Sequence, residues 1–452
     1  MVSSFVIFPC LLLACGLGAR AAETNSNSLV WHKAAGRVDA DLHGEPLWPL
    51  LEDIARQTGW HIFVEPGSSR NASTKFQDLQ ATDALRMLLG NLNFAFVPQT
   101  NGPDFLYVFT TRRENATRQV VATNTPPRRV ANELLVKLKP GTNIDALAKL
   151  LGAKITGRND KAGIYRLLFE NADSTGAALG SLKTNSDVAA VDYNYIYDAP
   201  PTPQLLANAP VGPVSLTLNP PGDSGKLVVG LIDTPVQPLD GSLNDFLLKQ
   251  VSVTGDTYDT GSDPTHGTAM AEAILRAISQ SSGGGGTSAQ ILPVNVYSSG
   301  ETTTSWDVAM GIQAAVDGGA NVLNLSLGGA GDSSVLDSVI AQAVAAGIPI
   351  FAAAGNQPLG TPTYPAADPG VLAVTATQGG QLAPYANYGS FVSLAFPGGV
   401  VIYLGGTAYV VQGTSVSTAT ATGVAVGNKS ALGWNWSQIE AAMQQKFSVP
   451  AK

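Results

Sequence analysis

Three residue types that together carry out nucleophilic catalysis occur in the order Asp233, His266 and Ser415. A serine hydroxyl attacks a carbonyl poorly unless a base takes its proton, which an imidazole does near neutral pH. A buried carboxylate can then fix the tautomer and charge of that imidazole. Taken singly, each residue also fits a structural role. The ordered combination predicts acyl transfer, with Ser415 as nucleophile, His266 as base and Asp233 as the group that orients the base.

The segments around these residues must place them together. Apolar runs predict strands at 227–232, 290–296, 322–325, 349–353 and 371–375, and helical patterns lie at 267–279, 305–317 and 333–346. This alternation indicates an α/β fold with a doubly wound, mostly parallel sheet. Asp233 follows the first strand, while His266 and Ser415 each open a helix. We therefore expect all three at the carboxyl edge of the sheet, where ligands bind.

The composition of the 452-residue chain narrows its class. Hydrophobic residues make up 44% and charged residues 13%, which excludes a disordered, highly charged chain. The net charge of −8 and the lack of a Lys/Arg-rich run argue against a nucleic-acid partner. The two cysteines, Cys10 and Cys15, both lie in the first 21 residues. If that segment is removed, the mature chain has no disulfide, thiol nucleophile or thiolate metal site.

Residues 1–21 are typical of a signal peptide, because an apolar run from Phe5 to Leu17 precedes small residues at Ala19 and Ala21. They predict a secreted or periplasmic protein. The residues that end at Cys15 loosely resemble a lipoprotein cleavage box, which leaves anchoring through this cysteine as an alternative.

Two stretches divide the rest of the chain into three parts. Residues 111–129 are polar and residues 199–225 are rich in proline, so both are typical of linkers. The folded parts are then residues 28–110, 130–198 and 226–452. The first two are expected to be small α+β domains.

In the first part, helices are expected from Pro46 to about Thr58 and from Thr82. Residues 47–59 and 84–89 resemble the short N-terminal domain of bacterial secretins and TonB-dependent receptors, which implies that this part docks a protein partner. A metal site shared by the histidines of this part is less favoured than separate structural roles; these are His32, His43 and His61.

In the second part, the predicted element order is β-α-β-α-β, with Asn143 as a helix cap and both helices on one face of the sheet. Residues 133–141 and 188–195 resemble the subtilisin propeptide, or inhibitor domain. This resemblance implies that the chain carries its own inhibitor in cis.

The third part resembles the subtilisin-like serine proteases, or peptidase S8 type, over nearly its whole length. The motifs around the triad are residues 229–234, 266–271 and 413–419, and further matches are residues 324–329, 353–356, 364–367 and 385–389. The resemblance implies that Asn356 supplies an oxyanion donor. The side-chain amide of Asn356 and the backbone N–H of Ser415 are groups that can stabilise the negative oxygen formed on attack.

The resemblance also implies a substrate site. Its backbone-binding strand and pocket walls would be Ser326, Leu327, Gly328, Ala354 and Gly355, with Thr363 near the pocket base. No acidic residue lies between Asn356 and Tyr364, so a neutral, mostly apolar side chain is expected before the scissile bond.

These observations together predict an exported serine endopeptidase, made as a self-inhibited precursor that cuts itself between about Tyr195 and Lys226. Three residues depart from the family pattern: Pro235, Glu272 and Ala419. They leave open an alternative, a weak or inactive subtilase-fold scaffold whose N-terminal domain docks a partner.

No cofactor or metal is expected. The family's calcium loop corresponds to residues 281–286, which contain no carboxylate. The acidic stretch with Asp256, Asp259 and Asp263 offers another place for calcium, although a solvated loop is favoured.

Overall fold

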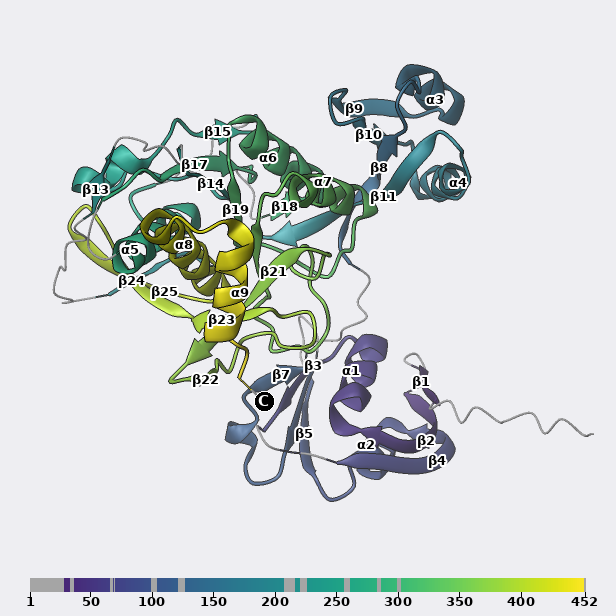
Figure 1. Ribbon diagram of the computed structural model, residues 1–452. Coiled ribbons are helices and arrows are strands. Elements are labelled where there is room, and N and C mark those ends of the chain that lie inside the picture. The colour runs from purple at the N-terminus through teal and green to yellow at the C-terminus, as the bar shows by residue number, and fades with distance from the viewer. Residues whose placement is uncertain are drawn as a thin grey trace, which may run out of the picture. The chain divides into compact units, whose positions relative to one another are not determined.

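The computed structural model describes residues 28–450, apart from 33–35, 66–67, 69, 99–103, 121–126, 207–215, 220–225, 256–260, 283–285 and 299–301. The predicted signal peptide, with Cys10 and Cys15, lies outside the described residues, as do Asp256, Asp259 and the centre of the loop at 281–286. The chain divides into two compact units, residues 1–125 and 126–452 (Figure 1).

The first unit is an α+β domain with two sheets around one core. The first sheet contains β1 (Ser28–His32), β2 (Arg37–Pro46) and β4 (Asn71–Gln80), and the second contains β5 (Asn93–Val97), β6 (Phe105–Phe109), β3 (His61–Val64) and β7 (Arg118–Val120). Helices α1 (Leu47–Thr58) and α2 (Ala81–Leu89) bury their leucines in this core. The Nε2 atom of His32 lies 2.9 Å from Asp39, while the His61 ring meets the Phe105 ring edge-on.

Two boundaries of the first unit differ from the sequence prediction. The first helix was expected to begin at Pro46, but α1 begins at Leu47. Pro46 is instead the last residue of β2, where it pairs with Asn71 of β4. Residues 118–120, predicted as linker, form β7 against β3. The short 3-10 helix Arg113–Asn115 precedes this strand, and the Glu65 carboxylate accepts hydrogen bonds from the backbone N–H groups of Thr110 and Thr111 at 2.6 and 2.8 Å. This anchor turns the chain back toward the sheet.

The second unit begins with a five-stranded sheet and two helices. In chain order its elements are β8 (Arg129–Leu138), α3 (Ile144–Leu151), β9 (Lys154–Asn159), β10 (Ile164–Leu168), α4 (Ala172–Lys183) and β11 (Val188–Asp198). The predicted cap at Asn143 is present, since its side chain accepts from the backbone of Asp145 and Ala146. Strand β9 was not predicted. The fifth strand, β18 (Thr302–Thr304), comes from the third part of the chain and pairs with the end of β11.

The two faces of β8 explain its uninterrupted apolar sequence. Leu134 and Val136 pack with residues of α3 and α4, so both helices cover one face as predicted. Leu135 points to the other face and joins the core formed by α6 (Ser305–Asp317) and α7 (Ser334–Ala345). The sheet is therefore buried on both sides, and the second part of the chain packs on the third.

The third part has the predicted doubly wound α/β fold. Its main sheet runs in the order β15 (Val251–Ser252), β17 (Gln290–Asn295), β14 (Val228–Asp233), β19 (Val322–Leu325), β20 (Ile350–Ala353), β21 (Val371–Gln378) and β22 (Gln381–Leu382), with β23 (Leu394–Pro397) also on β21. All pairs are parallel except β21 with β22.

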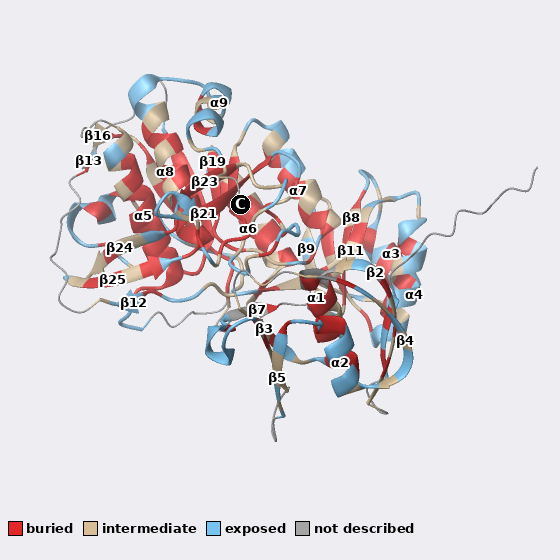
Figure 2. Cartoon of the chain, turned by 90° about the horizontal axis from the view of Figure 1, so that it is seen from below, coloured by how far each residue is buried: buried red, intermediate tan, exposed pale blue. Residues whose placement is uncertain are grey.

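Helices cover both faces of this sheet. On one face α5 (His266–Ser281), α8 (Thr414–Leu432) and α9 (Trp436–Lys446) share a core, in which α5 and α8 are among the most buried helices (Figure 2). On the other face lie α6 and α7. Within the described part of the chain, no helix combines the length and the apolar composition needed to cross a membrane.

Several short pairings were not predicted. The hairpin β24 (Gly399–Leu404) and β25 (Thr407–Gln412) leads directly into α8. Two-residue strands lie within the stretch predicted as linker: β12 (Gln204–Leu205) pairs with β25, and β13 (Thr217–Leu218) pairs with β16 (Gly286–Thr287). After the 3-10 helix Gly241–Phe246, the bridge between Leu247 and Ile291 extends the sheet edge.

Candidate active site

The structure brings the three predicted catalytic residues to the carboxyl edge of the sheet. Asp233 is the last residue of β14, His266 is the first of α5, and Ser415 is the second of α8. Their exposed fractions are 1%, 3% and 5%, so all three are buried in the described structure. A catalytic group on a helix or strand end is held more rigidly than one on a loop.

The imidazole of His266 is paired with the carboxylate of Asp233. Its Nδ1 atom lies 2.8 and 3.0 Å from the two carboxylate oxygens, and the backbone N–H of Thr234 donates to Oδ1 at 2.7 Å. This pairing fixes the Nδ1–H tautomer and directs Nε2 away from Asp233. The arrangement is what a general base for a serine hydroxyl requires.

Close backbone packing holds α5 against the end of β14. The N–H of Gly267 donates to Thr234 Oγ1 at 2.8 Å, and a Cβ atom at Gly267 would lie 2.2 Å from the carbonyl oxygen of Thr234. Thr265 caps the helix through a bond from the Thr268 backbone N–H. Only glycine fits at position 267, which explains its place beside the histidine.

Ser415 is tied to the end of β19. Its hydroxyl donates to the carbonyl oxygen of Ser326, and the Ser326 hydroxyl donates back to the carbonyl of Ser415, both at 3.2 Å. In the described structure this hydroxyl is therefore bonded to Ser326; catalytic hydrogen bonds commonly form only when substrate binds. The N-terminal end of α8 places partial positive charge beneath the serine.

The side-chain oxygen of Asn356 is held by two hydrogen bonds. Its Oδ1 atom accepts from the backbone N–H of Thr414 at 2.8 Å and from the Thr414 hydroxyl at 3.0 Å. This fixes the amide so that Nδ2 carries its N–H groups on the opposite side, beside Gly413, where a Cβ would lie 3.1 Å from it. Asn356 is exposed, so a substrate oxygen can reach these donors.

The residues predicted to form the pocket also lie together. Ser326 to Gly328 follow β19, and Gly355 follows its neighbour β20. The Thr363 hydroxyl donates to the carbonyl of Ala354 at 2.6 Å, which places its side chain behind Gly355. A Cβ atom at Gly355 would meet Thr363 Cγ2 at 3.5 Å and Asn387 Nδ2 at 2.5 Å. The side chains contributed by these positions are small or apolar.

Asn387 and Asn324 support the site without having been assigned a role from sequence. Asn387 Oδ1 accepts from the backbone of Gln357 at 2.8 Å and Leu359 at 3.3 Å, which shapes the loop after Asn356. Asn324 donates to the Ser326 hydroxyl at 2.9 Å. Both lie inside the motifs at 324–329 and 385–389, which was the one available signal.

Of the three departures from the family pattern, Glu272 has a clear structural role. It is 1% exposed, forms an ion pair with Arg276, and accepts from the backbone N–H of Tyr403 at 3.0 Å. It therefore connects α5 to β24. The carbonyl of Pro235 accepts from the Thr265 hydroxyl, and Ala419 is fully buried in α8.

Comparison with known proteins finds two matching families. The Subtilase family matches residues 224–448, and the Fervidolysin N-terminal prodomain matches residues 115–194. Thermitase of Thermoactinomyces vulgaris is 35% identical over 225 residues, 48% of this chain and 79% of its own. A thermophilic serine proteinase of Bacillus sp. (strain AK1) is 29% identical over 333 residues, 70% of this chain and 82% of its own.

A solved structure shows the same fold. Fervidolysin from Fervidobacterium pennivorans, described as a keratinolytic enzyme related to subtilisin, superimposes with a TM-score of 0.53 at 19% sequence identity, covering 69% of this chain and 57% of its own. With the family match and the similarity to thermitase, the chain belongs to the subtilase family of serine endopeptidases.

Proposed function

We propose that this subtilase is an exported endopeptidase that uses Asp233, His266 and Ser415 as its triad and is made as a self-inhibited precursor. The observation that carries the catalytic proposal is the buried pair of His266 Nδ1 and Asp233, at 2.8 Å, on the same sheet edge as Ser415. Export rests on the sequence of residues 1–21 alone.

In the proposed reaction, Ser415 Oγ attacks the carbonyl carbon of the scissile bond while His266 Nε2 takes its proton. Asp233 stabilises the resulting imidazolium and stays ionised. The negative oxygen accepts hydrogen bonds from Asn356 Nδ2 and the Ser415 backbone N–H. His266 then gives its proton to the leaving amine. In the second half of the reaction His266 takes a proton from water, the water oxygen attacks the acyl carbon, and His266 returns the proton to Ser415 Oγ as the acid product leaves.

The proposed self-inhibition is supported by polar contacts between β11 and the helices of the catalytic part. Asn194 Oδ1 accepts from the backbone N–H of Trp306 at 3.1 Å, in the first turn of α6. Asp192 Oδ2 accepts from the backbone N–H of Ser334 at 3.4 Å, at the start of α7. Helix N-termini carry unsatisfied N–H groups and favour such acceptors. Strand β11 therefore caps two helices of the domain that it would inhibit.

Two strand pairings support a path for the chain through the substrate groove. Asp198 pairs with Thr302 in β18, and Gln204 pairs with Val410 in β25, the strand that leads to Ser415. The buried Tyr197 donates its hydroxyl to the carbonyl of Gly331, in the loop that follows the substrate-binding residues. Six residue steps span at most roughly 20 Å. We infer that residues 199–203 cross the catalytic centre.

The sequence of this crossing limits where it can be cut. Pro200, Pro201 and Pro203 each supply a ring nitrogen to the bond before them, which leaves the tertiary amide without an N–H and with a bulky leaving side. The bonds with an ordinary amide nitrogen are then those before Ala199, Thr202 and Gln204. Few bonds of this proline-rich crossing are thus open to attack, so self-cleavage should be slow. Slow cleavage suits a precursor that stays inhibited during export.

We also propose broad specificity for neutral side chains before the scissile bond. The pocket residues are uncharged, and Thr363 at its base is 8% exposed and bonded to Ala354. A cation buried there would have no counter-charge from these residues. One methylene changes selectivity by only ~1–3 kcal/mol, so we expect preference for medium apolar groups rather than strict selection. A majority of cuts after Lys or Arg in a peptide library would contradict this.

For the first unit we propose the docking of a protein partner, as the sequence pattern at residues 47–59 implies. Pull-down with the full chain carrying Ser415→Ala, with and without residues 28–110, tests this proposal. Equal recovery of partners by both forms would contradict it.

A fluorophosphonate probe that labels serine hydrolases tests the catalytic proposal. Wild-type protein, incubated until mass spectrometry shows the cut, should be labelled. Ser415→Ala should not be labelled, and the control Ser430→Ala, at the exposed end of the same helix, should be labelled like wild type. Cut but unlabelled wild-type protein would contradict the proposal. Identical intact masses for wild type and Ser415→Ala after incubation would contradict self-processing.

A further inference from the structure

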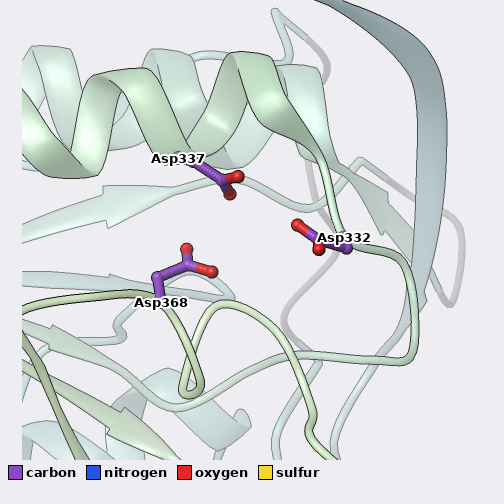
Figure 3. A group of neighbouring side chains, drawn as sticks. All are labelled: Asp332, Asp337 and Asp368. Carbon is purple, nitrogen blue, oxygen red and sulfur yellow. The ribbon is translucent and has the colours of Figure 1, made fainter.

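Three carboxylates meet beside the loops that carry Gly329 and Tyr364, outside the proposed triad. Asp332 lies in the loop after the substrate-binding residues, Asp337 in the first turn of α7, and Asp368 in the loop before β21. One oxygen from each lies within 4.8 Å of the others, and the three side chains point toward a common centre (Figure 3).

One carboxylate oxygen of the most buried member of this group lacks a hydrogen-bond partner in the described structure. Asp368 is 5% exposed, and in the described structure its Oδ2 atom has no donor within hydrogen-bonding distance. The charged groups that act on Asp368 are Asp337 and Asp332, which carry the same sign. A buried carboxylate in such surroundings is costly unless a cation or a proton compensates it.

Among the described residues, the charged groups that act on Asp368 and Asp337 are all carboxylates. Burial and the neighbouring carboxylates raise the pKa of Asp368 to about 8 and the pKa of Asp337 to about 7. Asp192 of β11 contributes to the effect on Asp337. Burial and Asp332 also raise the pKa of Tyr364. Because three carboxylates face one another within 4.8 Å and the buried Asp368 Oδ2 has no donor in the described structure, the centre of the group is favourable for a cation.

We propose that Asp332, Asp337 and Asp368 bind a calcium ion. The donors are all oxygens, which select hard cations over zinc or copper. Oxygens that share a calcium ion at 2.3–2.6 Å can be up to ~5 Å apart, so the observed separations need no rearrangement, whereas magnesium at ~2.1 Å would require the three groups to close in. Asp332 is exposed, so water can complete the coordination shell.

The ion would join two loops that form the pocket. Gly329 and Tyr364 exchange backbone hydrogen bonds of 2.9 and 2.7 Å, and Asp332 and Asp368 follow them by three and four residues. A calcium ion would join the same two loops a second time, at Asp332 and Asp368, and would connect both loops to α7 through Asp337. The site is distinct from the loop at 281–286 and from the acidic stretch at 256–263.

The test uses the full chain in the Ser415→Ala background, so that neither binding nor melting depends on activity. We expect one calcium to bind by calorimetry, and Tm at about a hundredfold excess over the dissociation constant to rise by roughly 5–10 °C relative to EDTA. Asp368→Asn should lose this binding and this rise. The control Asp245→Asn, an exposed carboxylate of the same domain, should keep both.

A second measurement avoids dependence on a buried substitution. Terbium replaces calcium, and excitation of the tyrosine beside Asp332, Tyr364, should sensitise terbium emission. Calcium should displace it, and Asp332→Asn, at an exposed position, should reduce the emission at least tenfold. Calcium-induced shifts that are equal in wild type and Asp368→Asn, or no calcium effect on wild type, would overturn the proposal.

Discussion

Asp233 and Asp368 are both almost completely buried, yet their surroundings are opposite. Asp233 accepts from His266 Nδ1 and from the backbone N–H of Thr234. Asp368 has an oxygen without a donor in the described structure and faces two further carboxylates. A buried carboxylate must be compensated. For Asp233 the chain itself supplies the partner, whereas for Asp368 the partner has to come from solution.

Glu272 is an intermediate case. It pairs with Arg276 and accepts from the Tyr403 backbone, but burial still raises the pKa of its carboxyl. Three buried acids in one domain therefore range from full to partial to missing compensation. Substitutions at these positions should differ in kind as well as in size.

The largest effect is expected from Asp233→Asn. Loss of the charge and of the tautomer control on His266 should slow the chemical step by ~10⁴-fold while the geometry stays intact. The rate at which the cut form of the precursor appears, measured by mass spectrometry, gives this value without a mature enzyme. Asp245→Asn is the matched control. A slowing of less than about tenfold would show that Asp233 is not the orienting acid.

Asn356→Ala extends the comparison to a side-chain amide. Its Oδ1 atom accepts from Thr414, while its Nδ2 atom is the proposed donor to the substrate oxygen. Removal of one oxyanion donor should lower turnover by ~10²–10³-fold, a figure measured within this family. KM for a peptide substrate should change little. Gln357→Ala, the exposed neighbour, serves as control. A change in KM alone would place Asn356 in substrate binding instead.

Glu272→Ala should lower the free energy of unfolding by ~1–3 kcal/mol, because it removes the hydrogen bond to the Tyr403 N–H and the ion pair with Arg276. Glu272→Gln should cost less, since its Oε1 can still accept from Tyr403. Between the ordinary pKa of 4.5 and the raised one, wild type should lose stability as pH rises, because the unfolded chain gives up its proton first. Urea unfolding checks this, with Glu440→Gln as control; an unchanged pH slope in Glu272→Gln would contradict it.

The smallest effect is expected from Asp368→Asn in calcium-free buffer. At pH 9, above the raised pKa of about 8, Asp368 is charged, so removing one of three like charges should raise Tm by about 2–4 °C, the shift that corresponds to about 1 kcal/mol in a domain of this size. Differential scanning calorimetry in EDTA, with the Ser415→Ala background, measures it. A lower Tm would mean that Asp368 already has a stabilising partner, and would remove the contrast with Asp233.

The sequence was most informative where one segment determines its own structure. The buried strands and the helices of the catalytic part follow from their own apolar patterns, and β14, β19 and β20 lie where they were expected. The placement of Asp233, His266 and Ser415 at one edge of the sheet could be predicted because each lies at a strand or helix end. By contrast, β12 and β13 are two residues long and exist because of their partners.

The acidic group could not be found from the sequence for a similar reason. Asp332, Asp337 and Asp368 lie in three segments, and the turn geometry at Gly329 and Tyr364 brings them together. The polar strands β2 and β4 of the first unit were also missed, because residues 71–80 show neither a strong apolar alternation nor a helical period. Leu135 gave no separate signal, although it forms the contact between β8 and the catalytic part.

The strand pairings of Asp198 and Gln204 set the length of chain that lies between them. Asp198 is fixed on β18 and Gln204 on β25, so on the proposed path the number of residues between them, rather than their identity, determines which bond reaches Ser415. One residue added beside Thr202 would give the segment slack and advance the frame of bonds by one position. The timing of maturation would then be encoded in chain length, and insertions between positions 199 and 203 would adjust it without any change in the catalytic residues.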